Sequence, residues 1–229
     1  MDNQSYFFDW STPIEHLPDL LQGALVTFVL TLIIFAIQLV VGALLGYIRY
    51  RKKPTIVYRI VSVYVEIFRN TPLLVQIFLI YFGLPQLKIY LNNYVAGILA
   101  ISLCECAYSC EIFRAGIQSV DKGQWEAGAC IALSRKRIFL DIISPQAMRN
   151  IFPAMINQFV YTMYMTTLLS ALDIHELVDV TTIIATSTFR TFEMYTFAII
   201  IFFIMSTLST FILKKINNRF FPSISKKGE

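Results

Sequence analysis

The sequence predicts an all-α membrane protein with about five transmembrane helices, the amino terminus outside and the carboxyl terminus in the cytoplasm. Three observations predict this class: an apolar composition, five long apolar stretches and an uneven distribution of basic residues. Of 229 residues, 56% are hydrophobic and 15% charged, and the mean hydropathy of +0.62 is too high for a soluble domain of this length. Backbone polar groups in lipid must bond to one another, so the apolar stretches are expected to be helices.

The apolar stretches define five predicted spans, since a helix needs roughly 20 apolar residues to cross a bilayer. The first is uncharged along its whole length, whereas the third is interrupted by Glu105 and Glu111. We expect one domain over 1–229, with spans at about 20–48, 57–87, 89–117, 149–172 and 190–214.

The basic residues predict the orientation, because Lys and Arg accumulate on the cytoplasmic side of membrane proteins. Seventeen of the 19 lie at 49–69, 114–149 and 214–227, the segments that follow the uncharged parts of the first, third and fifth spans: Arg49, Arg51, Lys52, Lys53, Arg59, Arg69, Arg114, Lys122, Arg135, Lys136, Arg137, Arg149, Lys214, Lys215, Arg219, Lys226 and Lys227. Lys88 and Arg190 fall in the opposite loops, and the segment before the first span has only acidic charges. At this boundary the basic residues are expected to meet anionic membrane lipid, so no nucleic-acid partner is predicted.

A four-residue sequence, Glu-Ile-Phe-Arg, occurs twice, at 66–69 and at 111–114. Glu and Arg three residues apart share a helix face, so each copy is expected to form an ion pair near the membrane boundary.

The longest polar segment, 118–148, alternates charged and apolar residues and predicts two short amphipathic helices, the second ending at Pro145. It contains Trp125 and Glu126 followed by the small residues Ala127, Gly128, Ala129 and Ala132. Small side chains suit a short helix that must seat closely in a groove on a partner protein. An amphipathic helix resting on the bilayer is the alternative interpretation.

This segment resembles the EAA loop of ABC importer permeases, in which Glu-Ala-Ala precedes a Gly and then Leu-Pro. Here Gly128 replaces the third residue of the motif, Ala132 stands at the expected Gly, and Ser144 replaces the Leu before Pro145. Longer stretches keep the order and spacing of the polar amino-acid permeases, the histidine, glutamine and arginine group: 66–76, 81–85, 107–126, 145–147, 157–159, 166–170, 176–177 and 189–193.

The resemblance implies a type I ABC importer transmembrane domain, a multi-pass permease of the bacterial cytoplasmic (inner) membrane. Its implied partners are a second permease subunit, identical or similar, two ATP-binding subunits and an extracytoplasmic amino-acid-binding protein. The sequence has no Gly-x-x-x-x-Gly-Lys-Ser/Thr phosphate loop, so ATP is expected on the partner ATPase, with no cofactor and no enzyme activity in this chain. The residues expected to couple to the ATPase are Trp125, Glu126, Ala127, Gly128 and Ala132.

Glu105 is the leading candidate for the substrate pathway, because an ionisable residue near the middle of a span suggests a functional site. It is expected to pair with the ammonium or basic side chain of a substrate, or to balance a partner charge. A protonated Glu bonded across helices is an equal alternative. The other pathway candidates are Asn70, Thr71, Gln76, Asn157, Tyr164 and Thr166.

Other interpretations stay open from the sequence. Relatives often carry a Lys-Asp pair where this chain has Tyr164 and Met165, so this could be the subunit of a heterodimer that holds no substrate. A non-transporting structural or channel-like membrane subunit is a further alternative. The four cysteines lack the paired spacing of a zinc site, and the sequence following His175 lacks a second His, so no metal site is predicted.

Overall fold

The computed structural model describes residues 7–220, which form helices and connecting turns without a β-strand in that range. Lys226 and Lys227, used above for the orientation, lie outside the described residues. The elements are α1 (Ser11–Glu15), α2 (Leu17–Arg51), α3 (Ile56–Arg69), α4 (Leu73–Phe78), η1 (Leu79–Gly83), η2 (Leu84–Leu87), α5 (Asn93–Gln118), α6 (Lys122–Cys130), α7 (Arg135–Arg137), η3 (Ile138–Ile143), α8 (Ser144–Met165), η4 (Thr166–Leu172), α9 (Leu177–Thr188) and α10 (Thr191–Phe220). The predicted all-α class is confirmed.

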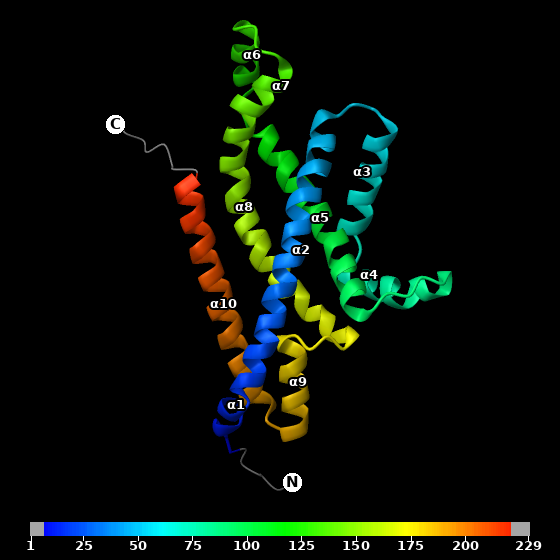
Figure 1. Ribbon diagram of the computed structural model, residues 1–229, viewed down its shortest axis with the longest axis vertical. Coiled ribbons are helices and arrows are strands. Elements are labelled where there is room, and N and C mark those ends of the chain that lie inside the picture. The colour runs from blue at the N-terminus through cyan, green and yellow to red at the C-terminus, as the bar shows by residue number, and fades with distance from the viewer. Residues whose placement is uncertain (1–6, 221–229) are drawn as a thin grey trace.

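The long helices alternate in direction and form an elongated bundle (Figure 1). In this view α2, α5 and α10 run upward, α8 runs downward, α1 and α9 lie at the lower end, and α6 and α7 form the upper end. Polar side chains start several helices by accepting a hydrogen bond from the first-turn backbone, as Thr55 does for α3 and Asn92 for α5.

α2 and α5 pack closely along the bundle core, and a glycine allows this. A Cβ atom on Gly46 would lie 2.7 Å from Cβ of Phe113 and 2.8 Å from the carbonyl oxygen of Cys110. Because one of these atoms belongs to the α5 backbone, a larger residue would have to separate the two helices.

Three helices within residues 7–220, α2, α5 and α10, are long and apolar enough to cross a membrane. A fourth is obtained if the pair Ile56–Arg69 and Leu73–Leu87 counts as one broken span. The predicted fourth span, 149–172, lies in α8 and η4 and does not meet the same criterion, since α8 begins with polar residues including Gln146, Arg149 and Asn150. The number five therefore stays a prediction, while several membrane helices are present.

The predicted second span, 57–87, is bent in the structure, and its two halves meet at 110°. Pro72 precedes α4, and Gln76 stabilises the corner: its Nε2 donates to the carbonyl of Phe68 at 2.9 Å and to the Thr71 hydroxyl at 2.8 Å. The polar residues at the corner thus replace the helix hydrogen bonds that the bend removes.

The loop 118–148 is also more helical than predicted. Its first helix is α6, but the second does not end at Pro145: α7, η3 and α8 follow without a break. Pro145 is the second residue of α8 and follows the π-helical turn η3. The irregular hydrogen-bond pattern of that turn accommodates a residue that has no N–H to donate to the helix.

Only one of the two predicted Glu-Arg ion pairs forms as expected. Arg114 contacts Glu111 at 2.6 Å, and Glu111 also binds Arg49 from the end of α2. Glu66 instead lies 3.8 Å from Arg49, and the guanidinium of Arg69 stands 5.3 Å over the Tyr108 ring. Arg49 therefore links the ends of three helices, because α2 brings it between the two carboxylates.

Candidate functional site

A cluster of polar side chains, four of them buried and one, Gln158, half-buried, lies in the middle of the helix bundle. We call it the polar cluster and define it by residues of α2, α5 and α8: Gln38, Glu105, Ser109, Gln158 and Thr162. Glu105 is fully buried and lies near the centre of α5, about 18 Å from either end at 1.5 Å per residue. The expectation that it faces the bundle interior agrees with this geometry.

Hydrogen bonds connect the members of the polar cluster across three helices. Nε2 of Gln158 donates to Oε2 of Glu105, and the Thr162 hydroxyl lies 3.0 Å from the same oxygen. Gln38 on α2 donates to the Thr162 hydroxyl at 3.0 Å and accepts from Ser109 at 3.2 Å. The second oxygen of Glu105, Oε1, is buried and has no hydrogen-bond partner among the described residues. An unpaired carboxylate oxygen in this setting is costly, so it could receive a donor from outside the chain.

The sequence reasoning missed four of the five members, Gln38, Ser109, Gln158 and Thr162. Charge was the signal used to find Glu105, and neutral polar residues in a span do not stand out by charge. An amide such as Gln38 inside an otherwise apolar stretch was the available signal, because buried amides require partners.

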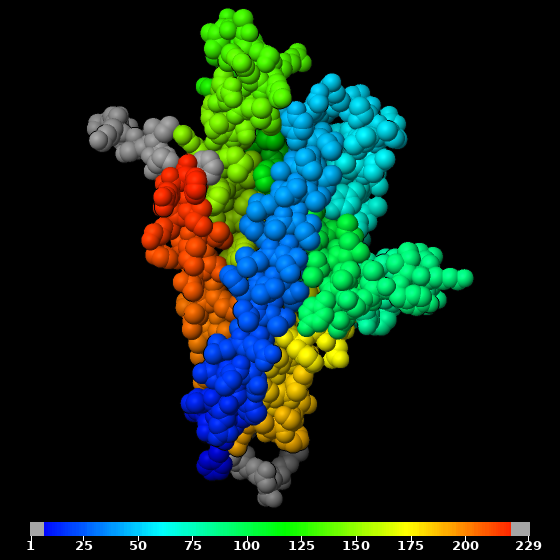
Figure 2. Space-filling model, viewed as in Figure 1, coloured from blue at the N-terminus to red at the C-terminus, as the bar shows by residue number. Residues whose placement is uncertain are grey.

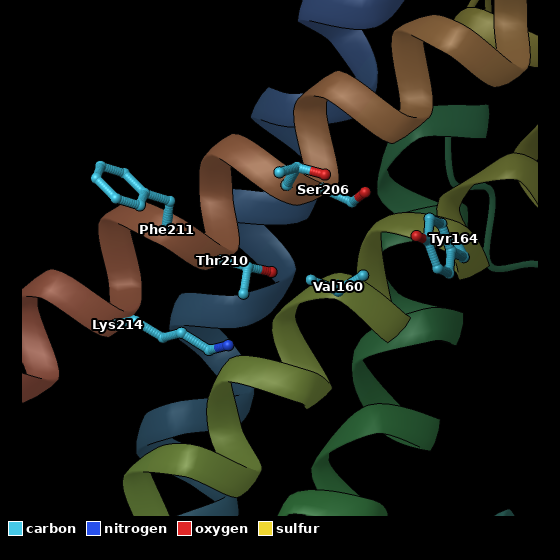
Figure 3. A pocket seen from close by; sticks show the side chains of 7 residues that line it. Val160, Tyr164, Ser206, Thr210, Phe211 and Lys214 are labelled. Atoms are coloured by element: carbon cyan, nitrogen blue, oxygen red, sulfur yellow. The ribbon is translucent and has the colours of Figure 1, made fainter.

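The other pathway candidates on α8 and η4 do not join the polar cluster. Thr166 is buried but donates its hydroxyl to the carbonyl of Met163, one turn earlier. Asn157 is exposed. Tyr164 is 43% exposed and lines a groove of about 430 Å³ between α8 and α10, opposite Ser206 and Thr210 (Figure 3).

Asn70, Thr71 and Gln76 lie together at the corner between α3 and α4. Asn70 and Thr71 donate to the carbonyls of Glu66 and Ile67, one turn earlier. Gln76 is buried, whereas the other two are exposed. The structure gives these three residues a role in shaping the bend, and it does not bring them into the polar cluster.

The predicted coupling residues lie on or directly after α6, at the far end of the bundle (Figure 1). The carboxylate of Asp121 starts this helix by accepting from the backbone N–H of Gly123 at 2.6 Å. Glu126 and Ala127 are exposed, and the Trp125 ring stacks on Phe139 of η3 with centroids 6.4 Å apart. α6 therefore presents a carboxylate and a small side chain outward, while Trp125 packs against the segment that continues into α8.

Gly128 packs inward, so it does not contribute to the outward surface of α6 in the way the sequence suggested. It is buried, and a Cβ at this position would lie 2.9 Å from Cγ1 of Ile138. A small residue is required at this position because the segment that contains Ile138 folds back over α6.

Ala132 has a left-handed backbone, with φ of 57°. Its N–H donates to the carbonyl of Ala129 at 3.0 Å, and the N–H of Leu133 donates to the carbonyl of Gly128 at 3.2 Å. This pair of bonds is the Schellman arrangement that ends many helices, and glycine is the usual residue at its left-handed position. The left-handed backbone at this position therefore explains why the EAA motif has a glycine where this chain has Ala132.

A family model described as "Binding-protein-dependent transport system inner membrane component" matches residues 38–222. The chain belongs to this family. It is therefore a multi-pass protein of the bacterial inner membrane, and the family comprises transport subunits rather than catalytic enzymes.

Named relatives cover most of the chain. It is 34% identical over 201 residues to a putative glutamine transport system permease protein GlnP of Rickettsia typhi, covering 87% of this chain and 92% of the relative. It is 29% identical over 212 residues to the arginine transport system permease protein ArtQ of Bacillus subtilis, covering 92% and 96%.

Solved structures extend the similarity to three dimensions. The crystal structure of an amino acid ABC transporter with histidines has a TM-score of 0.87 and 31% identity, covering 93% of this chain and 100% of that chain. An inward-facing MetNI methionine ABC transporter has a TM-score of 0.76 at 18% identity, covering 90% and 98%, which shows the shared fold alone.

Proposed function

We propose that this chain is the membrane permease subunit of an ATP-driven, binding-protein-dependent importer of polar amino acids. The observation that carries the proposal is the similarity along almost the whole chain to an amino acid ABC transporter, at 31% identity and a TM-score of 0.87. The partners are a second permease subunit, two ATP-binding subunits that hold the ATP, and an extracytoplasmic amino-acid-binding protein. The amino terminus is outside and α6 is cytoplasmic, as the distribution of basic residues indicates.

In this mechanism α6 transmits force and performs no chemistry. It lies between α5 and the continuous segment that becomes α8, and these two helices also hold Glu105, Gln158 and Thr162 of the polar cluster. A push on the exposed Glu126 surface by closing ATPases is thus applied to two of the three helices that form the polar cluster. Tilting α5 against α8 would change access to that cluster from outside to inside.

The coupling role of α6 is tested by reversing its exposed charge. Glu126→Lys should lower transport and separate it from ATP hydrolysis, measured as amino-acid uptake per ATP in vesicles containing the full complex. Asp141→Lys makes the same charge change at an exposed position outside α6 and should leave coupling intact. Normal coupling in the Glu126 variant, with the ATPase retained on purification, would overturn this assignment.

We further propose that Glu105 contacts the substrate through Oε1, the buried oxygen without a partner. An ammonium or basic side chain is the donor that a carboxylate in a low-dielectric site would favour. Glu105→Gln keeps the size and an acceptor but removes the charge, so it should raise KM for basic amino acids more than for neutral polar ones. Cys106→Ser, a neighbouring buried change, is the control. A KM unchanged by Glu105→Gln for every substrate would contradict the contact and favour a bonded, protonated Glu105, whereas an equal rise for all substrates would indicate that Oε1 meets the ammonium and not a basic side chain.

A further inference from the structure

A groove of about 1,090 Å³ lies between the end of α2 and the loop that contains α6. We call it the boundary groove. One wall comes from the last turn of α2 and the turn after it, and the other comes from α6, α7 and η3. In Figure 2 the lobe formed by α6 stands apart from the end of α2 at the top of the molecule.

The boundary groove is strongly cationic. Glu126 is its only acidic lining residue among those described, against five basic ones contributed by both walls: Arg51, Lys52, Lys53, Arg135 and Lys136. Within residues 7–220, none of the five forms an ion pair. Arg49, only two residues before Arg51, has two carboxylate partners, Glu66 and Glu111, and neither of these lines the groove. The unpaired positive charge therefore favours an anion supplied from outside this chain.

The same groove has an aromatic and apolar side. Tyr47 and Tyr50 line it from α2, and Trp125 and Phe139 line it from the loop, with the Tyr47 and Phe139 ring centroids 5.0 Å apart. Leu140 is 51% exposed at its edge. An anion without an apolar part would use only half of this lining.

The position of the groove along α2 explains the two kinds of lining. α2 is uncharged from Leu20 to Ile48, so Tyr47 lies at the end of the stretch that can sit in hydrocarbon. The groove cations begin at Arg51, about one helical turn later. The apolar lining thus lies at the edge of the hydrocarbon and the cations at the level of the headgroups, where Tyr and Trp also accumulate.

We propose that the boundary groove binds the phosphate headgroup of an anionic phospholipid from the adjacent leaflet. Cations from both walls contact the phosphate, while the aromatic rings contact the glycerol and the first part of the acyl chains. A lipid held in this way would connect the end of α2 to the α6 loop. The site requires that the chain lies in a membrane but does not depend on the proposed transport activity.

The test uses the full-length chain, purified with the subunits that accompany it, in phosphatidylcholine vesicles containing a photoactivatable phosphatidylglycerol. Lipid attached to groove peptides is counted by mass spectrometry. Lys53→Gln with Lys136→Gln removes one exposed cation from each wall and should reduce the attachment about tenfold, because each basic residue near a membrane surface contributes to anionic lipid binding. Lys215→Gln with Arg219→Gln removes the same charge from exposed positions on α10, outside the groove, and should change it less than about twofold.

Three outcomes would overturn the proposal. Equal attachment in the two double variants would show that the groove has no preference for the lipid. Competition by inorganic phosphate as strong as that by unlabelled phosphatidylglycerol would indicate a site for a free anion. Loss of an accompanying ATPase from the Lys53/Lys136 variant, with lipid attachment unchanged, would show that the cations face an acidic protein surface.

Discussion

Replacing Ala132 by glycine should stabilise the end of α6. Ala132 has φ of 57°, where a Cβ atom clashes with the following backbone, and the left-handed conformation costs an alanine about 1 kcal/mol more than a glycine. The two Schellman hydrogen bonds use only backbone atoms, so they survive the substitution. We expect Ala132→Gly to gain about 1 kcal/mol in local stability, which is roughly a fivefold change in an opening equilibrium.

Hydrogen exchange at the Leu133 amide measures this effect, because that amide donates to the carbonyl of Gly128 across the turn. Its exchange should slow about fivefold in Ala132→Gly. Ala129→Gly is the matched control: the chemical change is the same, but Ala129 is exposed and has a right-handed helical backbone within α6. It should cost about 0.8–1 kcal/mol and speed the exchange. Faster exchange in Ala132→Gly, or the same sign in both variants, would refute a left-handed backbone at Ala132.

Three further predictions concern other parts of the fold. Gly46→Ala should lower the free energy of unfolding by about 1–3 kcal/mol, because its Cβ would lie 2.8 Å from an α5 carbonyl oxygen, and this is measured as a lower melting temperature of the purified protein. Gly83→Ala is the control: its Cβ would meet only a side chain at 3.3 Å, so the melting temperature should not fall. The hydrogen bond with Asp179 at 2.7 Å raises the pKa of His175 above its ordinary 6.5. The pair therefore stabilises the start of α9 below about pH 6.5, and this contribution is lost as the pH rises through the raised pKa. Hydrogen exchange in α9 should follow that pH dependence, and Asp179→Asn should abolish it. Glu176→Ala should destabilise α9 by about 1 kcal/mol, because the Glu176 carboxylate accepts hydrogen bonds from two first-turn N–H groups. Hydrogen exchange in α9 measures this loss. Glu176→Gln keeps an acceptor oxygen and should destabilise α9 less.

Several features of the site could be predicted only in part. The depth of Glu105 in the third span followed from its position in an apolar stretch, but its partners did not, since Gln158 and Thr162 come from a helix 53 and 57 residues away in sequence. Gly128 was expected on the outward surface of α6 because small residues suit a docking face. It lies inward because Ile138 folds back over it, and that contact depends on the path of the chain after Ala132.

By itself the sequence determined the class of this protein: apolar length and composition require membrane helices, and the alternation of charged and apolar residues in 118–148 predicted a short helix around Glu126. These features depend on local composition and on spacing within one helix, which a linear sequence contains. Only the tertiary structure decided the 110° bend after Arg69, the continuation of the helix through Pro145 and the polar cluster around Glu105. Each of these depends on which hydrogen-bond partners and which helix surfaces meet in space, and residues far apart in the chain supply them.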